Sequence, residues 1–359
     1  MLTMSTDDNT VCDVARPARM SPVSFAGCFG WLHAPADGAA GDVAVVLCAG
    51  LKNDAITAYR SFRLLADAMA AAGYPTLRFD YPGTGNSRDS AEPEHWAAWQ
   101  RSVHAAADWL REQSGARRVV LCGLRFGATL AMVVAEQRDD VAGLLLLEPV
   151  PRGGSYIRQL SIEAMLHDPG AQAHGGLVLH ELRLSRETVT LISQVDLRKV
   201  ALPPACPVAV YAQTTTPVLH DCAEVWRSGG SQVTCEEFAG LEPMLRPVFM
   251  NHEPPADMAR FVDWLKVAVP ARSASPRQAR ALGDTVLRAA GYVEAPLRFG
   301  RAGNLFGILC RPSGSPSGHS GAELAVVIGN GGGLPHSAAV SVDLARRLAA
   351  AGIASLRMD

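Results

Sequence analysis

Short apolar runs alternate with longer stretches of helical periodicity along most of this chain. The runs have the length of buried strands, and between them apolar side chains recur at helical spacing, as Phe62, Leu65 and Met69 do before Gly73. The expected strands are residues 43–48, 75–80, 118–122, 141–147, 206–212 and 232–238. The expected helices are residues 58–72, 94–113, 128–136 and 256–267. This alternation predicts an α/β fold with a mostly parallel sheet and helices on both of its faces.

Changes in composition divide the chain into segments. Residues 1–22 are polar and predict a flexible N-terminus, whereas residues 23–268 hold the α/β pattern. Within them, residues 151–204 contain helical fragments framed by prolines and no clear strand, which indicates a cap-like insertion between core strands. Residues 269–292 begin with a stretch rich in Pro and Ser and are interpreted as a linker. Residues 293–359 then start a second, incomplete copy of the N-terminal part.

Similarity within the chain supports that second copy. Residues 325–331 resemble residues 44–50, and residues 344–359 resemble residues 65–80 in the same order and at nearly the same spacing. We interpret this similarity as an internal repeat. A sheet built from only three or four strands would leave apolar faces uncovered. We therefore expect either a fragment of a longer tandem protein or a second half that packs on the first.

The composition favours a folded protein that binds small molecules or other proteins. Apolar residues make up 48% of the chain and the formal net charge is -2, so electrostatics gives no reason to expect nucleic acid or an anionic membrane as a partner. No apolar run is long enough to predict a membrane span. The eight cysteines include no C-x-x-C spacing. We therefore expect no metal, no cofactor and a reduced, cytoplasmic location.

One motif carries the candidate chemistry. The sequence Gly123-Leu124-Arg125-Phe126-Gly127 lies between a predicted strand and a predicted helix, which is the setting of a G-x-S-x-G nucleophile elbow. Gly123 and Gly127 are expected to permit the strained turn and the close approach of strand and helix. The central residue would then stand above the sheet at a helix N-terminus.

Together with residues 45–50 and the turn at residues 80–87, this motif resembles the α/β-hydrolase superfamily. The resemblance covers nearly all of residues 23–268 and is closest to the serine-aminopeptidase-like branch. Residues 147–160 resemble the hydrolase-like proteins associated with exosortase A and exopolysaccharide systems. The resemblance implies an α/β-hydrolase fold and an activity of the ester or acyl hydrolase class.

The resemblance fails at the positions where it implies a catalytic triad. Arg125 stands at the nucleophile position, and a guanidinium group has only donors and stays charged. After the strand that the acid should follow, the chain has Gln213, and the first carboxylate is Asp221. Near the histidine position it has Gly240, and His252 lies well beyond. Asp221 and His252 are weak catalytic candidates, and we expect this copy to be inactive as a serine hydrolase.

Two interpretations of Arg125 stay open. Free N–H groups and the positive dipole end of a helix suit an anion, so Arg125 and Phe126 are candidates to bind a carboxylate or phosphate. Gly50 and Leu51, in the loop after an adjacent strand, are candidates for the same ligand. In the second interpretation Glu148, at the end of the neighbouring strand, forms an ion pair with Arg125. We favour the ion pair, because a part-buried charge without a partner is costly, and the two interpretations can coexist.

The remaining candidates are interpreted structurally. His33 is expected to pack at a strand end, and Cys122 to point into the core. Trp96 and Trp99 are expected to pack one helix against its neighbours. Residues 331–333, three glycines, occupy the place where hydrolases form an oxyanion hole, and a plain flexible loop is an equal interpretation.

Two hypotheses about function follow from these observations. In the first, the chain belongs to a tandem hydrolase whose second hydrolase-like repeat carries the chemistry. In the second, the chain is a non-catalytic module that binds an anionic or acyl small molecule or a partner protein. An activity-based probe for reactive serines separates the two hypotheses.

Overall fold

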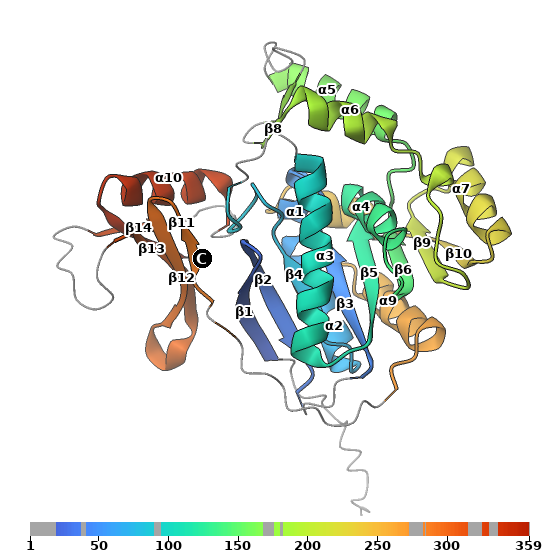
Figure 1. Cartoon of the computed structure of the whole chain (residues 1–359), viewed down its shortest axis with the longest axis horizontal. Coiled ribbons are helices and arrows are strands. Elements are labelled where there is room, and N and C mark those ends of the chain that lie inside the picture. Colours follow the sequence, from blue (N-terminus) through green and yellow to red (C-terminus); the bar gives the residue numbers. More distant parts are fainter. Residues whose placement is uncertain are drawn as a thin grey trace, which may run out of the picture.

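A computed structural model describes most of the chain (Figure 1). The described residues are 19–36, 41–89, 95–167, 176–179, 182–272, 283, 285–314, 325–329 and 337–358. They form two units, each built on its own sheet. We call residues 19–272 the first unit and residues 285–358 the second unit.

The first unit is built on an eight-stranded sheet. Its strands are β1 (Arg19–Phe25), β2 (Cys28–Ala34), β3 (Val43–Cys48), β4 (Thr76–Phe79), β5 (Arg118–Leu124), β6 (Val141–Leu147), β9 (Pro207–Ala212) and β10 (Gln232–Glu237). Their spatial order is β1-β2-β4-β3-β5-β6-β9-β10. The pairs β1–β2 and β2–β4 are antiparallel, and all the other pairs are parallel. The predicted α/β fold with a mostly parallel sheet is confirmed.

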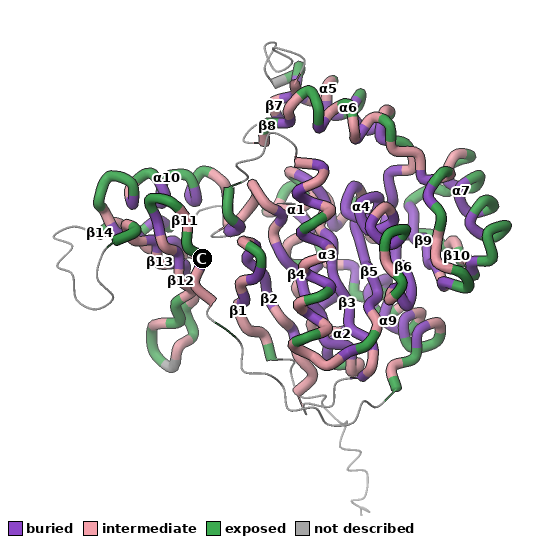
Figure 2. Tube along the Cα trace, viewed as in Figure 1, coloured by how far each residue is buried: buried purple, intermediate pink, exposed green. Residues whose placement is uncertain are grey.

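Helices cover both faces of this sheet (Figure 1). They are α1 (Asn53–Thr57), α2 (Tyr59–Ala71), α3 (His95–Ser114), α4 (Phe126–Ala135), α7 (Pro217–Ser228), α8 (Leu241–Leu245) and α9 (Pro255–Ala268). Val46 and Leu121 share one core with α3 and α4, whereas Val45 and Val120 share the other with α2 and α9. Consecutive residues of the central strands thus enter opposite cores, which explains their unbroken apolar runs and complete burial (Figure 2).

Local sequence signals explain where several helices begin and end. Thr216 caps α7 by accepting a hydrogen bond from the backbone N–H of Leu219, and a proline occupies the first turn. Ser185 caps α6 (Arg186–Gln194) in the same way through Thr188. Gly73 follows α2 with φ 94°, in the left-handed region that favours glycine.

The predicted insertion forms a cap beyond the carboxyl ends of the parallel strands (Figure 1). It contains α5 (Gly153–His167), β7 (Leu177–Leu179), β8 (Leu182–Leu184), α6 and a short 3₁₀ helix at Leu197–Lys199. The antiparallel β7–β8 hairpin was not predicted, because its strands are too short to show a period of two. Its residues Leu177 and Leu179 are buried against the first core and anchor the cap.

The second unit repeats part of the first unit's topology. It contains β11 (Leu287–Ala289), β12 (Tyr292–Phe299), a 3₁₀ turn (Arg301–Gly303), β13 (Leu305–Pro312), β14 (Ala325–Gly329), α10 (Ala339–Ala350) and β15 (Ala354–Met358), with strand order β11-β12-β13-β15-β14. The run β12-β13-β15-β14 has the same sequence of two antiparallel pairs and one parallel pair as β1-β2-β4-β3. Gly30 and Gly307 correspond in this register, and a Cβ atom at either would press on the carbonyl oxygen of Arg78 or Arg357.

Besides the cap hairpin, strands β1, β2, β11, β12 and β13 lie where no strand was predicted, and two of them fall in segments that were interpreted otherwise. β1 begins at Arg19, inside the N-terminus that was expected to be flexible, and β11 lies inside the expected linker, residues 269–292. Polar residues interrupt both strands, so neither has a continuous apolar run that would identify it in the sequence. Residues 1–18 and 273–282 lie outside the described residues.

Aromatic and aliphatic side chains join the two units beside β1 and β2. The ring centroids of Trp31 and Phe306 lie 4.6 Å apart. Ile308 of β13 packs with Phe29 and Trp31 in one buried cluster. The outward face of β2 is therefore covered by the second unit, which lies beside it in Figure 1.

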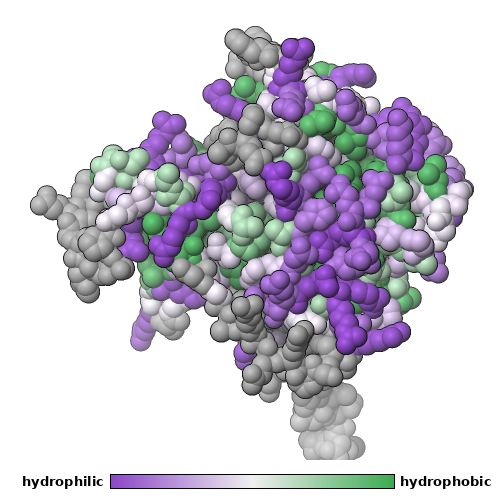
Figure 3. Space-filling model, viewed as in Figure 1, coloured by the Kyte–Doolittle hydropathy of each residue, from purple (hydrophilic) through white to green (hydrophobic). Residues whose placement is uncertain are grey.

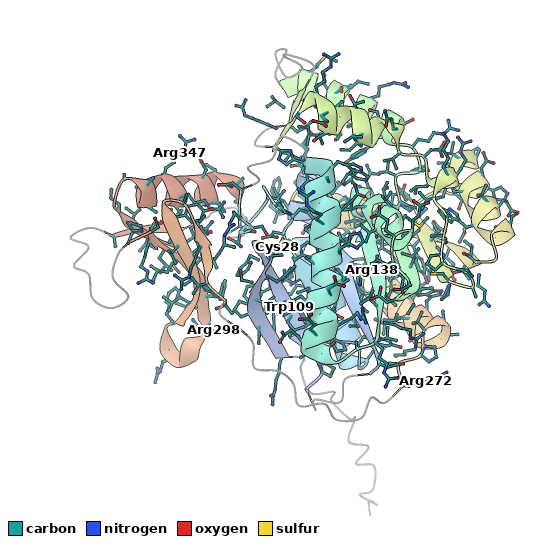
Figure 4. All side chains as sticks on the ribbon, viewed as in Figure 1. Cys28, Trp109, Arg138, Arg272, Arg298 and Arg347 are labelled. Carbon is teal, nitrogen blue, oxygen red and sulfur yellow. The ribbon has the colours of Figure 1, made fainter. Side chains whose placement is uncertain are left out.

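A buried arginine of α10 completes this contact. Arg346 donates hydrogen bonds to the carbonyl oxygens of Asn86 (3.4 Å) and Ser87 (2.9 Å), and its Nη1 lies 2.7 Å from Asp89. The next residue, Arg347, points outward from α10 and is largely exposed (Figure 4). Arg346 therefore fastens the second unit to the loop that follows β4.

Candidate functional site

The predicted elbow has the geometry of a strained strand-to-helix turn. Arg125 joins β5 to α4 with φ 54° and ψ −119°, a conformation that is unfavourable for a residue with a Cβ atom. A Cβ atom at Gly123 would meet the backbone of Ala128, and one at Gly127 would meet the carbonyl oxygens of Cys48 and Ala49. Both glycines are thus required for the contact between β5, α4 and the end of β3.

The carboxylate that meets Arg125 comes from α1. Nε of Arg125 lies 3.4 Å from Oδ2 of Asp54, and each side chain is roughly three-quarters buried, with exposures of 23% and 24%. The predicted ion pair with Glu148 is wrong. Glu148 has φ 48°, and its Oε2 instead accepts a hydrogen bond of 2.7 Å from the backbone N–H of Gln213.

A second ion pair lies beside the first. Nζ of Lys52 is 3.1 Å from Oε1 of Glu163, which the cap supplies from α5, and the Lys52 side chain is only 7% exposed. Lys52 has nearly the same strained backbone as Arg125, with φ 54° and ψ −127°. Lys52, Asp54, Arg125 and Glu163, here called the charge cluster, carry two positive and two negative formal charges and therefore compensate one another.

The electrostatics of the charge cluster follow from its burial. Burial raises the pKa of the Asp54 carboxyl above its ordinary value, and the charges of Arg125 and Lys52 partly offset this effect. Asp54 can take its position beside Arg125 because residue 50 is glycine. A Cβ atom at Gly50 would lie 2.6 Å from that of Asp54. Asp54 and Arg125 therefore satisfy one another where a hydrolase would hold its nucleophile.

Phe126, the other elbow candidate, belongs to an aromatic core. Its ring stacks on Tyr156 of the cap with centroids 5.5 Å apart, and it meets Trp96 and Trp99 edge-on. Phe126 is 1% exposed, and burial raises the pKa of the Tyr156 hydroxyl. Trp96 and Trp99 thus pack a helix, in line with the structural interpretation, and only the backbone N–H of Phe126 is left as a candidate ligand contact.

The weak catalytic candidates do not meet at the elbow. Asp221 is exposed on α7, and His252 is exposed in the loop between α8 and α9, where its backbone N–H donates to the carbonyl of Pro243. Gln213 occupies the place that the resemblance assigns to the acid, and it is exposed. The described residues therefore offer no acid–histidine pair beside Arg125.

A cavity of about 330 Å³ lies beside the charge cluster. It is bordered by residues 49–56, by residues 79–85, by the β7–β8 hairpin through Leu179 and Leu182, and by the start of α10. The predicted ligand residues Gly50 and Leu51 line it, whereas Arg125 and Phe126 do not. A smaller cavity of about 50 Å³ adjoins it and is bordered by Asp54, Asp80 and Arg78. The three glycines at residues 331–333 lie outside the described residues.

Sequence reasoning missed Lys52, Asp54 and Glu163. A signal for Asp54 was present, because Asn53-Asp54 follows a predicted strand and acidic residues favour the first turn of a helix. The strand order then places that turn beside the elbow, since β3 pairs with β5. No comparable signal identified Glu163, because its approach depends on how the cap folds back over the sheet.

The described residues add three observations. Hydrophilic residues cover much of the face around α3 (Figure 3). Among the described residues, no cluster of three or more metal-ligating side chains occurs. No helix in the same part of the chain is long and apolar enough to cross a membrane.

Comparison with known proteins agrees with the α/β architecture of the first unit. Residues 41–191 match the family model of the serine aminopeptidases, S33. A thermostable monoacylglycerol lipase from Bacillus sp. (strain H-257) is 31% identical over 85 residues, which are 24% of this chain and 33% of the lipase. The match thus spans about a third of that relative's length.

Solved structures resemble the chain over about 70% of its length. Est1E from Butyrivibrio proteoclasticus is 11% identical and has a TM-score of 0.52, covering 70% of this chain and 98% of its own. DcsB, solved with a substrate analogue, is 12% identical with a TM-score of 0.50, covering 72% of this chain and 100% of its own. The first unit has the α/β-hydrolase fold. Its sequence similarity lies in the serine-aminopeptidase-like branch of that superfamily, as predicted.

Proposed function

We propose that this chain is a non-catalytic member of the α/β-hydrolase superfamily that binds a small ligand with an acyl or other aliphatic part. The observation that supports this proposal is the combination at the elbow of an ion-paired arginine with a cavity that is still open beside it. Arg125 pairs with Asp54 at 3.4 Å, and the cavity of about 330 Å³ is bordered by Asn53 and Ala55, the chain neighbours of Asp54.

The chemistry of the site argues against acyl transfer. An acyl-enzyme mechanism needs a nucleophile that a base can deprotonate. A guanidinium group has only hydrogen-bond donors and stays charged, so it can act neither as the nucleophile nor as the base. The charge cluster also satisfies its own charges, so Arg125 is poorly suited to bind an external anion. The proposal therefore moves the ligand from the elbow to the neighbouring cavity.

The cavity suits an apolar ligand of modest size. Its wall includes Leu51, Ile56, Tyr59, Leu179 and Leu182, and its volume lies at the lower end of the usual range for small-molecule sites. The name of the relative from Bacillus sp. refers to an acylated glycerol as the compound on which that protein acts. An acyl group is therefore our proposed ligand class. We extend the proposal to a cytoplasmic role in an exopolysaccharide system, and this extension is supported by sequence resemblance alone.

The strand order of the second unit favours one other candidate function. In that alternative, β12, β13, β15 and β14 begin a second hydrolase-like repeat, and that repeat carries the chemistry in a tandem enzyme. The two candidates make the same prediction for this polypeptide. They differ for a longer gene product that contains it, in which only the tandem candidate expects labelling of a reactive serine. An activity-based fluorophosphonate probe should leave this polypeptide unlabelled under either proposal, whereas labelling of this chain would contradict the loss of catalysis.

A cavity-filling pair of variants tests the binding proposal. Ala339 at the start of α10 lines the cavity, whereas its neighbour Val340 is exposed and does not line it. We expect Ala339→Trp to abolish binding of octanol, used as a neutral aliphatic probe in calorimetry, and Val340→Trp to leave it unchanged. Equal binding by both variants would place the ligand elsewhere.

A further inference from the structure

Arg78 is a buried cation that has no carboxylate partner among the residues that the structure describes. It lies on β4 with 6% exposure, and its Nε donates to Nε2 of His33 at 3.1 Å. Its Nη2 lies 3.6 Å from the sulfur of Met20. The guanidinium carbon stands over the rings of Tyr59 (4.8 Å) and Trp31 (5.6 Å). These neighbours solvate a cation only in part, because none of them carries a negative charge.

His33 stays neutral in this arrangement. Its Nδ1 lies 2.7 Å from Oδ1 of Asp67, and its Nε2 accepts the hydrogen bond from Arg78. A ring nitrogen that accepts carries no proton, so Nδ1 is the one that donates to Asp67. The carboxylate of Asp67 is thus separated from Arg78 by a whole imidazole ring.

The second unit shows how the same position is compensated when a carboxylate is supplied. Arg357 occupies the place of Arg78 in the matching strand β15, and its Nη2 lies 2.7 Å from Oε1 of Glu294. The register of the two sheets matches Glu294 to Met20, because Cys310 pairs with Glu294 and its counterpart His33 pairs with Met20. Where the second unit has a buried carboxylate, the first unit has a thioether.

Arg78 borders the smaller cavity, and no described residue accepts a hydrogen bond from its Nη1. Two carboxylates border the same cavity, and each has another partner. Asp54 pairs with Arg125, and Asp80 accepts a hydrogen bond of 2.8 Å from the backbone N–H of Asn86. The smaller cavity shares Gly50, Tyr59 and Phe79 with the larger one, so the two cavities adjoin and a ligand that extends from the larger into the smaller one would approach Arg78.

We propose that Arg78 binds the carboxylate of an amphipathic ligand whose aliphatic chain occupies the larger cavity. This inference rests on the binding role proposed above and adds the class of ligand, an aliphatic monocarboxylate. The ligand's carboxylate would supply Arg78 with the negative charge that Glu294 supplies to Arg357 in the second unit. Binding a charged acceptor with a buried guanidinium is favourable, because both charge and hydrogen bonds are matched away from water.

The experiment compares octanoate with octanol on the full chain by calorimetry. We expect octanoate to bind about 10- to 100-fold more tightly, the effect of a charge-assisted hydrogen bond. Arg78→Met should remove this preference and leave octanol binding within about twofold of the unchanged chain, as an apolar isostere leaves the larger cavity intact. The control Arg125→Met should keep the preference, because that arginine is already paired with Asp54.

A second variant avoids the removal of a buried side chain. Met20→Glu copies the arrangement of Glu294 and Arg357, supplies Arg78 with an internal carboxylate and should likewise abolish the octanoate preference. Equal affinity of the unchanged chain for octanoate and octanol would overturn the role of Arg78 and leave the cavity as a binding site. Binding of neither compound would overturn the binding role of the cavity as well. If octanoate still binds more tightly than octanol to both Arg78→Met and Met20→Glu, another residue binds the carboxylate of octanoate.

Discussion

The two units of this protein place an arginine at the same point of the same topology and surround it with different chemistry. In the first unit Arg78 meets a neutral imidazole, a thioether and two aromatic rings beside a cavity. In the second unit Arg357 and Arg346 share the buried carboxylate of Glu294. In both units the buried arginine lies on the strand that pairs antiparallel with one neighbour and parallel with the other. The units differ in the groups that surround its guanidinium group.

The matching strands β3 and β14 differ in a second way. Every residue of β3 is buried because β4 and β5 flank it, whereas β14 pairs with β15 alone among the described strands and leaves Val327 64% exposed. The same apolar sequence pattern thus gives a core strand in one unit and an edge strand in the other. Topological similarity of the two units therefore does not imply equal burial or equal stability.

The largest expected effect is on the buried carboxylate of the second unit. Glu294→Gln leaves Arg357 and Arg346 without the charge that both contact, and breaking a buried pair costs about 3–5 kcal/mol. The matched change in the first unit, Met20→Leu, should cost less than about 1.5 kcal/mol, because it conserves volume and apolar character. Urea unfolding of the full chain measures both, and equal costs would contradict the comparison.

The next effect concerns the contact between the units. Arg346→Met removes the donor to the carbonyl oxygens of Asn86 and Ser87 and one of the two cations that contact Glu294. We expect a loss of about 2–3 kcal/mol, because buried acceptors are left unpaired while Arg357 still compensates Glu294. The ion pair of Arg346 with Asp89 adds little, since that carboxylate is 71% exposed. Hydrogen exchange should become faster in residues 86–89. The exposed neighbour supplies the control: Arg347→Met should change stability by no more than about 0.5 kcal/mol, and an equally large effect there would sink the assignment.

The elbow shows how far the sequence alone could lead. The glycines on either side of Arg125 and the flanking apolar strand and apolar helix are local signals, and they correctly predicted the fold. The partner of Arg125 was not predictable in the same way, because β3 and β6 both flank β5 and each delivers a carboxylate to its end, Asp54 or Glu148. The backbone of Glu148, at φ 48°, directs its carboxylate to Gln213 instead.

Elements that depend on tertiary packing were harder still. The cap hairpin and β11 are three-residue strands, too short for a periodic pattern, and they are held by their packing on other elements. The match between Met20 and Glu294 was also invisible in the sequence, because the edge strands carry little similarity and only the register of the two sheets relates them. A site that is proposed from differences between two units of similar strand order requires the structures of both units for its recognition.

A smaller and pH-dependent effect is expected at the elbow. Because burial raises the pKa of Asp54 in the folded chain above its ordinary 3.8, ionisation of this group weakens folding as pH rises through that range. Arg125→Met removes a charge that lowers this pKa, so the pKa should rise further and the stability deficit should grow with pH. We expect about 1–2 kcal/mol at about pH 7 and a smaller deficit at about pH 4, because protonation of Asp54 removes the charge that Arg125 compensates. Urea unfolding at both pH values measures this deficit, and one independent of pH would show that Asp54 and Arg125 are not coupled.

The smallest expected effect is on turnover, and it is the sharpest test of the elbow. Arg125→Ser places a hydroxyl group at the nucleophile position, yet Gln213 occupies the predicted acid position and His252 is exposed far along the chain, so no base is arranged to deprotonate it. We expect hydrolysis of p-nitrophenyl butyrate to stay at the level of an Arg125→Ala control and a fluorophosphonate probe to leave residue 125 unlabelled. Labelling of the new serine would show that a base lies within reach of the elbow. The acid and the histidine of a triad would then come from other loops than those that carry Gln213 and His252.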